Sequence, residues 1–173
     1  MDHQSRWMAL FIFFLVGGWN FMAALSIKSP IFEHGKIIPK KCACSKISPP
    51  LSWSEAPAET VSFALICDDP DAPREKPWVH WVIFNIPKTV TSLPEHAKTI
   101  PGATEGINDS GNIGYDGPCP PKGHGVHRYF FKLYALDTTL NLLEGATKDD
   151  VERAMKGHIL EEAEIMGTFE RKK

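Results

Sequence analysis

A run of aspartates and prolines separates two apolar segments in the middle of the chain, and no other feature restricts the fold as strongly. Residues 61–66 are mostly apolar and lead through Cys67 into the DDPDAP run at 68–73, and a second apolar segment follows at 78–86. Proline lacks a backbone N–H and disfavours helical geometry in the residue before it, so the run cannot extend a strand or a helix. The sequence therefore predicts two strands joined by a stiff turn, which holds carboxylates at the end of a strand.

A second polar cluster stands at the start of another apolar segment. Residues 114–126 are rich in glycine and proline, and a His-Arg-Tyr triplet at 127–129 opens the apolar segment at 130–136. If the two polar clusters meet in space, they combine imidazoles, carboxylates and a phenol in one place. A purely structural interpretation is also open, in which the aspartates cap their turn through hydrogen bonds to backbone N–H groups and His80 lies in the core.

These stretches resemble motifs of the phosphatidylethanolamine-binding protein family, also described as Raf-kinase-inhibitor-protein-like. The similarity lies in DPDAP followed by WVH at 78–80, and in GYDGPCPPKGHGVHRY at 114–129. The segments SPPLSW, VHWV and GHIL are similar to the YbhB/YbcL-like branch of bacteria and archaea. Several motifs in the family's order, from about Ile31 to the C-terminus, make the resemblance specific. It implies a mainly-β fold, an antiparallel β-sandwich with one or two peripheral helices. Short strands between Pro/Gly loops favour the same fold class.

The two polar clusters form the candidate ligand site. From the residues alone, their meeting would bring together Asp69, Asp71, His80, His127 and Tyr129. The resemblance implies the same pocket, with a rim formed by Pro73, Trp78, Tyr115 and Gly117. Imidazole and phenol groups donate hydrogen bonds to the oxygens of an anion, and glycines let backbone N–H groups approach closely. A carboxylate beside a histidine fixes its tautomer, and it could also bind an amine. The set suits a small ligand that carries a phosphate or carboxylate, such as a phosphoethanolamine head group.

We therefore expect a binding protein and not an enzyme, with neither a cofactor nor a bound metal. The family that the chain resembles includes lipid head-group binders, kinase regulators and protease inhibitors, so a protein partner and a homodimer both stay open. The alternative is a hydrolase or metal enzyme that uses His80, His127 and Asp69, although the chain has neither a G-x-S-x-G nor an H-E-x-x-H motif. The formal net charge of −2 gives no electrostatic footprint for nucleic acid.

Residues 1–26 have the layout of a secretory signal peptide. A polar start that contains Arg6 precedes the apolar segment at 8–25, and the A-L-S triplet at 24–26 is a small-x-small cleavage site. We expect the domain at 27–173 to be exported, either to a periplasm or as a secreted protein. The alternative is an uncleaved signal anchor, because the apolar segment approaches the length that spans a bilayer. In that case the protein contacts the membrane only through this leader.

Export makes Cys42, Cys44, Cys67 and Cys119 candidates for disulfides, and four cysteines allow three complete pairings. Cys42 and Cys44 would face the same way along a strand, which argues against a bond between them. A zinc site at this Cys-x-Cys lacks a second pair of ligands at comparable spacing. Cys119 would approach the pocket if its loop folds back.

The remaining expectations concern the C-terminal helix and the polar residues near the site. Thr147 is a suitable N-cap, and apolar residues at helical spacing predict a helix to about Glu164 despite Gly157. Arg128 should form a structural ion pair because its neighbours point the other way along a strand, and His124 should be exposed. The predicted solvated face of the helix consists of Glu161, Glu162 and Glu164. The predicted aromatic core consists of Trp53, Phe63, Trp81, Phe84, Phe130 and Phe131.

Overall fold

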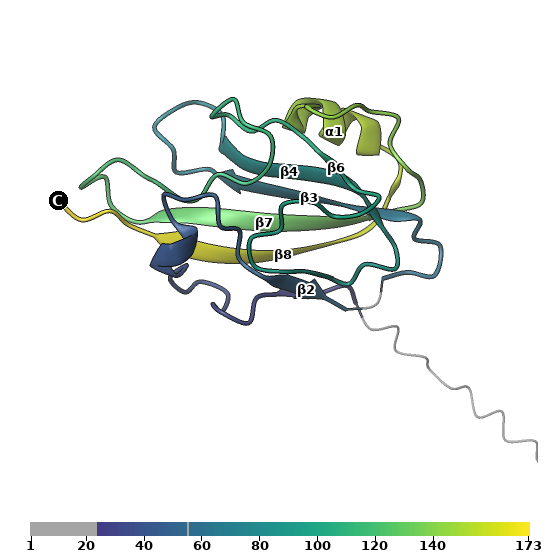
Figure 1. The fold of residues 1–173 in the computed structure, drawn as a ribbon, viewed down its shortest axis with the longest axis horizontal. Coiled ribbons are helices and arrows are strands. Elements are labelled where there is room, and N and C mark those ends of the chain that lie inside the picture. Colours follow the sequence, from purple (N-terminus) through teal and green to yellow (C-terminus); the bar gives the residue numbers. More distant parts are fainter. Residues whose placement is uncertain (1–23, 55) are drawn as a thin grey trace, which may run out of the picture.

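The computed structural model describes residues 24–54 and 56–173, and two antiparallel sheets dominate it (Figure 1). The larger sheet has the strand order β6-β4-β3-β7-β8, and the smaller sheet has the order β1-β2-β5. The bounds of the larger sheet, in chain order, are β3 Ser62–Asp69, β4 Trp78–Pro87, β6 Thr104–Glu105, β7 His127–Leu136 and β8 Ile159–Phe169. Those of the smaller sheet are β1 Ile27–Lys28, β2 Leu51–Trp53 and β5 Ser92–Leu93. The predicted mainly-β antiparallel fold is confirmed.

β3 lies at the centre of the larger sheet, and all 8 of its residues are buried. Its side chains project alternately to the two faces of the sheet. On one face they pack against the smaller sheet, where the rings of Trp53 and Phe63 lie 5.5 Å apart between centroids. On the other face Ala64 and Ile66 belong to a second apolar cluster with residues of α1 (Lys148–Met155). In Figure 1, α1 and β2 accordingly lie on opposite sides of the larger sheet.

The C-terminal helix begins where the sequence predicts but ends much earlier. The Thr147 hydroxyl accepts a hydrogen bond from the Asp150 N–H at 3.2 Å, and the Asp150 carboxylate accepts one from the Thr147 N–H at 3.1 Å. The prediction of a helix to Glu164 is wrong, because α1 ends at Met155 and β8 follows. Gly157 lies between them with a φ of 87°, a left-handed conformation that glycine adopts without strain and that ends the helix.

The residues that were predicted to continue the helix instead form β8, which pairs along the whole of β7. From Glu161 to Gly167 the side chains alternate between the core and solvent, which is the period of a strand. Glu162 and Glu164 are exposed, as predicted. Glu161 is only partly exposed, and its carboxylate accepts a hydrogen bond from the Leu25 N–H at 2.9 Å.

The aromatic core is largely as predicted, with one exception. Five of the six predicted aromatic residues are buried, namely Trp53, Phe63, Trp81, Phe84 and Phe131. Phe130 is only half-buried, because it projects to the outer face of β7. There the Arg128 guanidinium lies 5.8 Å from its ring centroid and the Lys132 ammonium lies 5.7 Å from it. The side chains of Arg128 and Lys132 therefore shield the Phe130 ring, which does not pack in the core.

The predicted leader falls mostly on residues 1–23, which lie outside the described part of the chain. Residues 24–26 are described, and Leu25 packs among the core residues. None of the helices in the described ranges, α1 included, has both the length and the apolar character that a membrane span requires.

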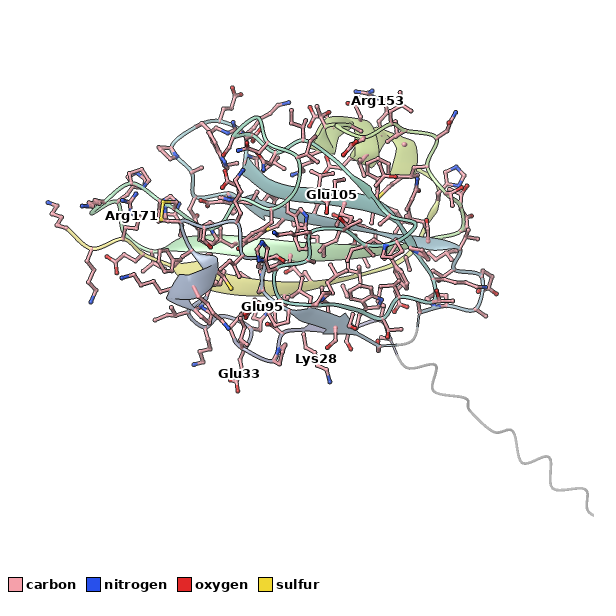
Figure 2. The ribbon with its side chains drawn as sticks, in the orientation of Figure 1. Lys28, Glu33, Glu95, Glu105, Arg153 and Arg171 are labelled. Atoms are coloured by element: carbon pink, nitrogen blue, oxygen red, sulfur yellow. A yellow bond between two sulfur atoms is a disulfide. The ribbon has the colours of Figure 1, made fainter. Side chains whose placement is uncertain are left out.

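One disulfide joins Cys44 to Cys119 across 75 residues of sequence. Cys42 and Cys67 are free thiols and are both buried. No bond joins Cys42 to Cys44, as predicted, but the reason given is wrong, because Cys42 ends a 3-10 helix (Lys40–Cys42) and Cys44 lies in a loop. Figure 2 draws the disulfide as a yellow bond at the same end of the molecule as Arg171, whose guanidinium contacts the Pro120 carbonyl at 3.4 Å.

Candidate functional site

The two polar clusters meet at one end of the larger sheet because of its strand order. β3 pairs antiparallel with both β4 and β7, so the end of β3 lies beside the starts of its two neighbours. Asp69 is paired with Trp78, and Asp68 is paired with Phe130. The sheet thus brings together a turn and a loop that are far apart in the sequence.

A cavity of about 490 Å³ opens at this meeting point. Seven of the nine predicted site residues line it, namely Asp69, Pro73, Trp78, His80, Gly117, His127 and Tyr129. Further lining residues that the sequence analysis did not name as site residues are Cys44, Ala72, Ser110, Asp116, Cys119, Pro120 and Pro121. The cavity therefore combines an apolar proline and aromatic wall with a few converging polar groups, as small-molecule sites commonly do.

Asp69 and His127 form a buried pair at the base of the cavity. Nδ1 of His127 lies 2.7 Å from Oδ2 of Asp69, and the two side chains are only 2% and 5% exposed, respectively. The other oxygen of Asp69 accepts a hydrogen bond from the Asp71 N–H at 2.8 Å. Because Nδ1 of His127 donates to a carboxylate, its Nε2 carries a lone pair when the ring is neutral.

His124 continues this chain of contacts to the surface. Its Nδ1 lies 2.7 Å from Nε2 of His127, and the residue itself is exposed, as predicted. Its contact with His127 was not predicted, because loop residues three positions apart can take many relative orientations. Asp69, His127 and His124 thus form a continuous polar chain from the interior to solvent.

His80 approaches the cavity from β4. Its Nδ1 lies 2.7 Å from the backbone carbonyl oxygen of Asp116, so Nδ1 donates and Nε2 is the acceptor in the neutral ring. Burial lowers the pKa of His80, although the Asp116 carbonyl and nearby carboxylates oppose this shift. The ring is therefore neutral at neutral pH and offers an acceptor, not a donor, at Nε2.

Tyr129 supplies a hydroxyl whose hydrogen-bonding capacity is unused within the described residues. Its side chain is wholly buried, and no atom of that part of the chain bonds to its hydroxyl. The rings of His80 and His127 flank it at centroid distances of 5.2 Å and 6.4 Å. Burial, followed by the charge of Asp69, raises the pKa of Tyr129, so the phenol stays protonated and can donate. An unsatisfied buried polar group costs about 1–3 kcal/mol, which a ligand acceptor would offset.

Two predicted residues support the cavity from outside its lining. Asp71 accepts hydrogen bonds from Nε and Nη2 of Arg128 at 2.9 Å and 2.7 Å, and these bonds lower the pKa of Asp71. The predicted ion pair of Arg128 is thereby confirmed. Tyr115 is buried behind the cavity, where its hydroxyl donates to the Cys42 carbonyl at 3.0 Å and its ring meets the edge of Trp81.

The residues that the sequence analysis missed carried weak signals. Asp116 contributes through its backbone carbonyl, which no side-chain pattern reveals. Cys44 lines the cavity beside its disulfide partner Cys119, and the sequence left that pairing open. Arg74 acts from outside the lining, where its guanidinium lies 4.8 Å from the ring centroid of Trp78 and pairs with Asp109. Arg74 therefore steadies the aromatic rim without entering the cavity.

A larger cleft of about 690 Å³ lies between the start of β4 and α1, but its cations are already paired. Arg74 pairs with Asp109, Lys76 pairs with Asp149, and Lys148 pairs with Asp68 and with Glu152. Within residues 24–54 and 56–173, no three side chains of His, Cys, Asp or Glu converge to hold a metal ion. The smaller cavity is therefore the better candidate for a ligand site.

Comparison with known proteins relates this chain to one protein family. The profile of the family described as phosphatidylethanolamine-binding protein matches residues 28–170. A UPF0098 protein of Methanothermobacter thermautotrophicus is 54% identical over 153 residues, which cover 85% of this chain and 99% of that protein. A UPF0098 protein of Aquifex aeolicus is 45% identical over 167 residues, which cover 93% of this chain and 95% of that protein.

Two crystal structures have the same fold. A phosphatidylethanolamine-binding protein homologue from Chlamydia trachomatis aligns with a TM-score of 0.80 at 45% identity, over 86% of this chain and 98% of its own. YbcL of Escherichia coli, described as a member of the mammalian family, aligns with a TM-score of 0.80 at 34% identity, over 86% of this chain and 99% of its own. On these grounds the chain belongs to the phosphatidylethanolamine-binding protein family, in its bacterial and archaeal branch.

Proposed function

We propose that this chain is an exported binding protein whose cavity captures a small anionic group, such as phosphate or a phosphoethanolamine head group. The observation that carries the proposal is the Tyr129 hydroxyl, a buried donor near the Asp69 carboxylate that makes no hydrogen bond of normal geometry among the described residues. Its neighbours His80 and His127 line the same cavity. Such an arrangement is costly for an empty protein and favourable for one that binds an acceptor.

The protonation of the site restricts which anion fits. His80 and His127 each commit Nδ1–H to a protein acceptor, and Nε2 of His127 already contacts Nδ1 of His124. When the rings are neutral, Nε2 of His80 is therefore the lone-pair acceptor that a ligand can use. The Asp69 carboxylate adds negative charge at the base. A fully deprotonated anion would therefore face repulsion, whereas an anion that carries one proton can donate it to an imidazole. Phosphate monoesters, whose second pKa is about 6, exist partly in that form near neutral pH.

The rim offers partners for an amine on the same ligand. Asp116 and Trp78 both line the cavity. A carboxylate pairs with an ammonium group, and an indole ring attracts a cation over its face. A zwitterionic ligand, with a phosphate at the base and an amine at the rim, matches this distribution of groups.

The contacts of the histidines favour binding over catalysis. A nucleophilic hydroxyl or thiol must lie within hydrogen-bonding reach of its base. In the described ranges, the polar contacts of His80 and His127 are to a carbonyl, a carboxylate and another imidazole. The two sulfurs that line the cavity are tied in a disulfide. We therefore assign no hydrolytic role to His80, His127 and Asp69. If the chain has a partner protein, we expect that protein to contact the rim of the same cavity.

The proposal can be tested by calorimetric titration of the exported domain with phosphoethanolamine. Tyr129→Phe removes one hydroxyl and should weaken binding about tenfold, which corresponds to the loss of one hydrogen bond to a charged group. Tyr134→Phe is the matched control, because Tyr134 lies on the same strand but lines a different surface hollow. Undetectable binding by the parent protein would contradict the proposal. Turnover of a phosphate ester upon addition of metal ions would favour the enzyme alternative.

A further inference from the structure

The disulfide that joins Cys44 to Cys119 forms part of the cavity wall. Both cysteines line the cavity together with Asp69, His80 and Tyr129. Cys119 stands within a loop, residues 117–126, that also carries the Pro120 and Pro121 wall. The bond therefore connects one side of the candidate site directly to a distant segment of the chain.

The rest of that loop is held at its two ends. At its start, Gly117 N–H donates to the Ser45 carbonyl at 2.8 Å, and Cys44 N–H donates to the Pro118 carbonyl at 3.0 Å. The approach is so close that a Cβ on Gly117 would lie 2.3 Å from the Cys42 carbonyl oxygen. Further along, Gly123 N–H donates to the Arg171 carbonyl at 2.8 Å. The loop contains neither helix nor strand, and the covalent bond at Cys119 holds the residue that lies between Pro118 and the proline wall.

The disulfide joins the two exposed cysteines of the described chain. Cys44 and Cys119 are exposed, whereas Cys42 and Cys67 are buried in the core. Burial raises the pKa of both free thiols, which keeps them as unreactive thiols. A dithiol in solution can therefore reach the bond, whereas Cys42 and Cys67 are buried and held as thiols. In that reaction one thiolate attacks a sulfur, the second thiol resolves the mixed disulfide, and Cys44 and Cys119 leave as two thiols.

We propose that the Cys44–Cys119 disulfide is a positioning element of the cavity, and that its reduction lowers the affinity of the cavity for a small anion. Reduction releases Cys119 from Cys44 beside the proline wall, in the loop that also carries His124, the partner of His127. The ligand would then have to order the loop as it binds, and that ordering weakens affinity. The inference rests on the proposed function, since it concerns the same cavity.

The test compares the oxidised domain with the same protein reduced by dithiothreitol, which is uncharged and cannot compete as an anion. Titration with phosphoethanolamine should show affinity at least about tenfold weaker after reduction. The double variant Cys44→Ser/Cys119→Ser should bind as weakly as the reduced parent and should not respond to dithiothreitol. That insensitivity controls for other effects of the reductant. Unchanged affinity after verified loss of the disulfide overturns the inference.

A second measurement separates this inference from the proposed function. Deuterium uptake at residues 117–126, and the ring resonances of His127, are followed without ligand in both redox states. Faster uptake in the loop and shifted His127 resonances upon reduction support the positioning role. If the oxidised protein fails to bind phosphoethanolamine, the proposed function is wrong, and uptake alone then decides the inference. In that case identical uptake in the two states overturns it.

Discussion

Nδ1 of His127 lies 2.7 Å from Oδ2 of Asp69, and this pair sits almost wholly sealed at the end of β3. The first prediction concerns the charge of that pair. Asp69→Asn keeps the shape but removes the carboxylate, and it should lower the free energy of unfolding by about 2 kcal/mol because a buried hydrogen bond to a charged group is weakened. Urea denaturation measures the loss. Asp71→Asn is the control and should cost less, because the Asp71–Arg128 pair is partly exposed.

The second prediction concerns the unsatisfied hydroxyl of Tyr129. Tyr129→Phe should raise the free energy of unfolding of the ligand-free protein by about 1 kcal/mol, because it removes a buried donor without a partner. The same variant should bind phosphoethanolamine more weakly, so stability and affinity should move in opposite directions. Thermal unfolding with and without ligand measures both. A variant that is less stable than the parent without ligand would show that the hydroxyl has a structural partner.

The third prediction concerns Glu105 on β6, whose carboxylate accepts a hydrogen bond from Nε1 of Trp81 at 2.9 Å. Burial, aided by the charge of Glu144, raises the pKa of Glu105 to about 7, although the Trp81 bond opposes the shift. The unfolded chain loses this proton at lower pH than the folded protein does. Stability should therefore fall as the pH rises from the ordinary glutamate range to about 7, and the full penalty should remain above that.

Glu105→Gln tests this relationship, because the glutamine oxygen can still accept from Trp81. The variant should be more stable than the parent by about 2 kcal/mol at pH 8 and should equal it at about pH 4. Denaturant midpoints across this range give the comparison. Glu144→Gln is a control for the smaller charge effect. A constant difference between Glu105→Gln and the parent at all pH values would contradict the assignment.

The fourth prediction concerns Asp68, a buried carboxylate that contacts the ammonium groups of Lys132 and Lys148. Either lysine can neutralise it alone, so Lys132→Met and Lys148→Met should each lower the free energy of unfolding by about 1 kcal/mol. The double variant leaves a buried charge unpaired and should lose about 3–5 kcal/mol. Urea denaturation of all four proteins completes the double-mutant cycle. Additive losses would mean that Asp68 does not depend on a shared pair of cations.

The fifth prediction concerns the pH dependence of anion binding. Protonation of His80 would turn Nε2 into a donor, and burial lowers the pKa of His80, so affinity should rise as the pH falls below the ordinary histidine value of about 6.5. Calorimetric titrations with phosphate and with sulfate between pH 5 and about 8 distinguish a proton carried by the anion from a proton carried by the histidine. Sulfate carries no proton in this range, so its affinity reports the histidines alone. Flat sulfate affinity in the parent, or an unchanged slope in His80→Ala, would contradict the role of His80.

Local signals in the sequence were sufficient to predict the elements that build the site. The proline and aspartate run ends β3, although the strand continues through Asp68 and Asp69, which the sequence analysis had excluded from it. The apolar segments on both sides of the run form β3 and β4, and the His-Arg-Tyr triplet opens β7. The candidate residues lie next to these signals, and most of them converge because neighbouring antiparallel strands place their ends together. The N-cap at Thr147 was equally local, since its partner Asp150 is three residues away.

Contacts between distant residues decided the features that the sequence could not predict. Ile159 and Ala163 fit a helical period as well as a strand period, and only the pairing with β7 selects the strand. The cysteine pattern allowed three pairings, and the choice of Cys44 with Cys119 depends on how the loop folds back. The acceptor for His80 is a backbone carbonyl that becomes available only when the residue 116 region lies against β4.

The contact between Leu25 and Glu161 places the entry of the chain into the domain at one extremity of β8, whereas Phe169, at the other extremity, is paired with His127 of the cavity. The eight residue-to-residue steps from Glu161 to Phe169 span about 26 Å at the rise of an extended strand. Any tether at the N-terminal side would therefore be attached at the end of β8 that lies away from the cavity. The binding mouth would face outward from the attachment point, free to meet ligands that approach from the medium.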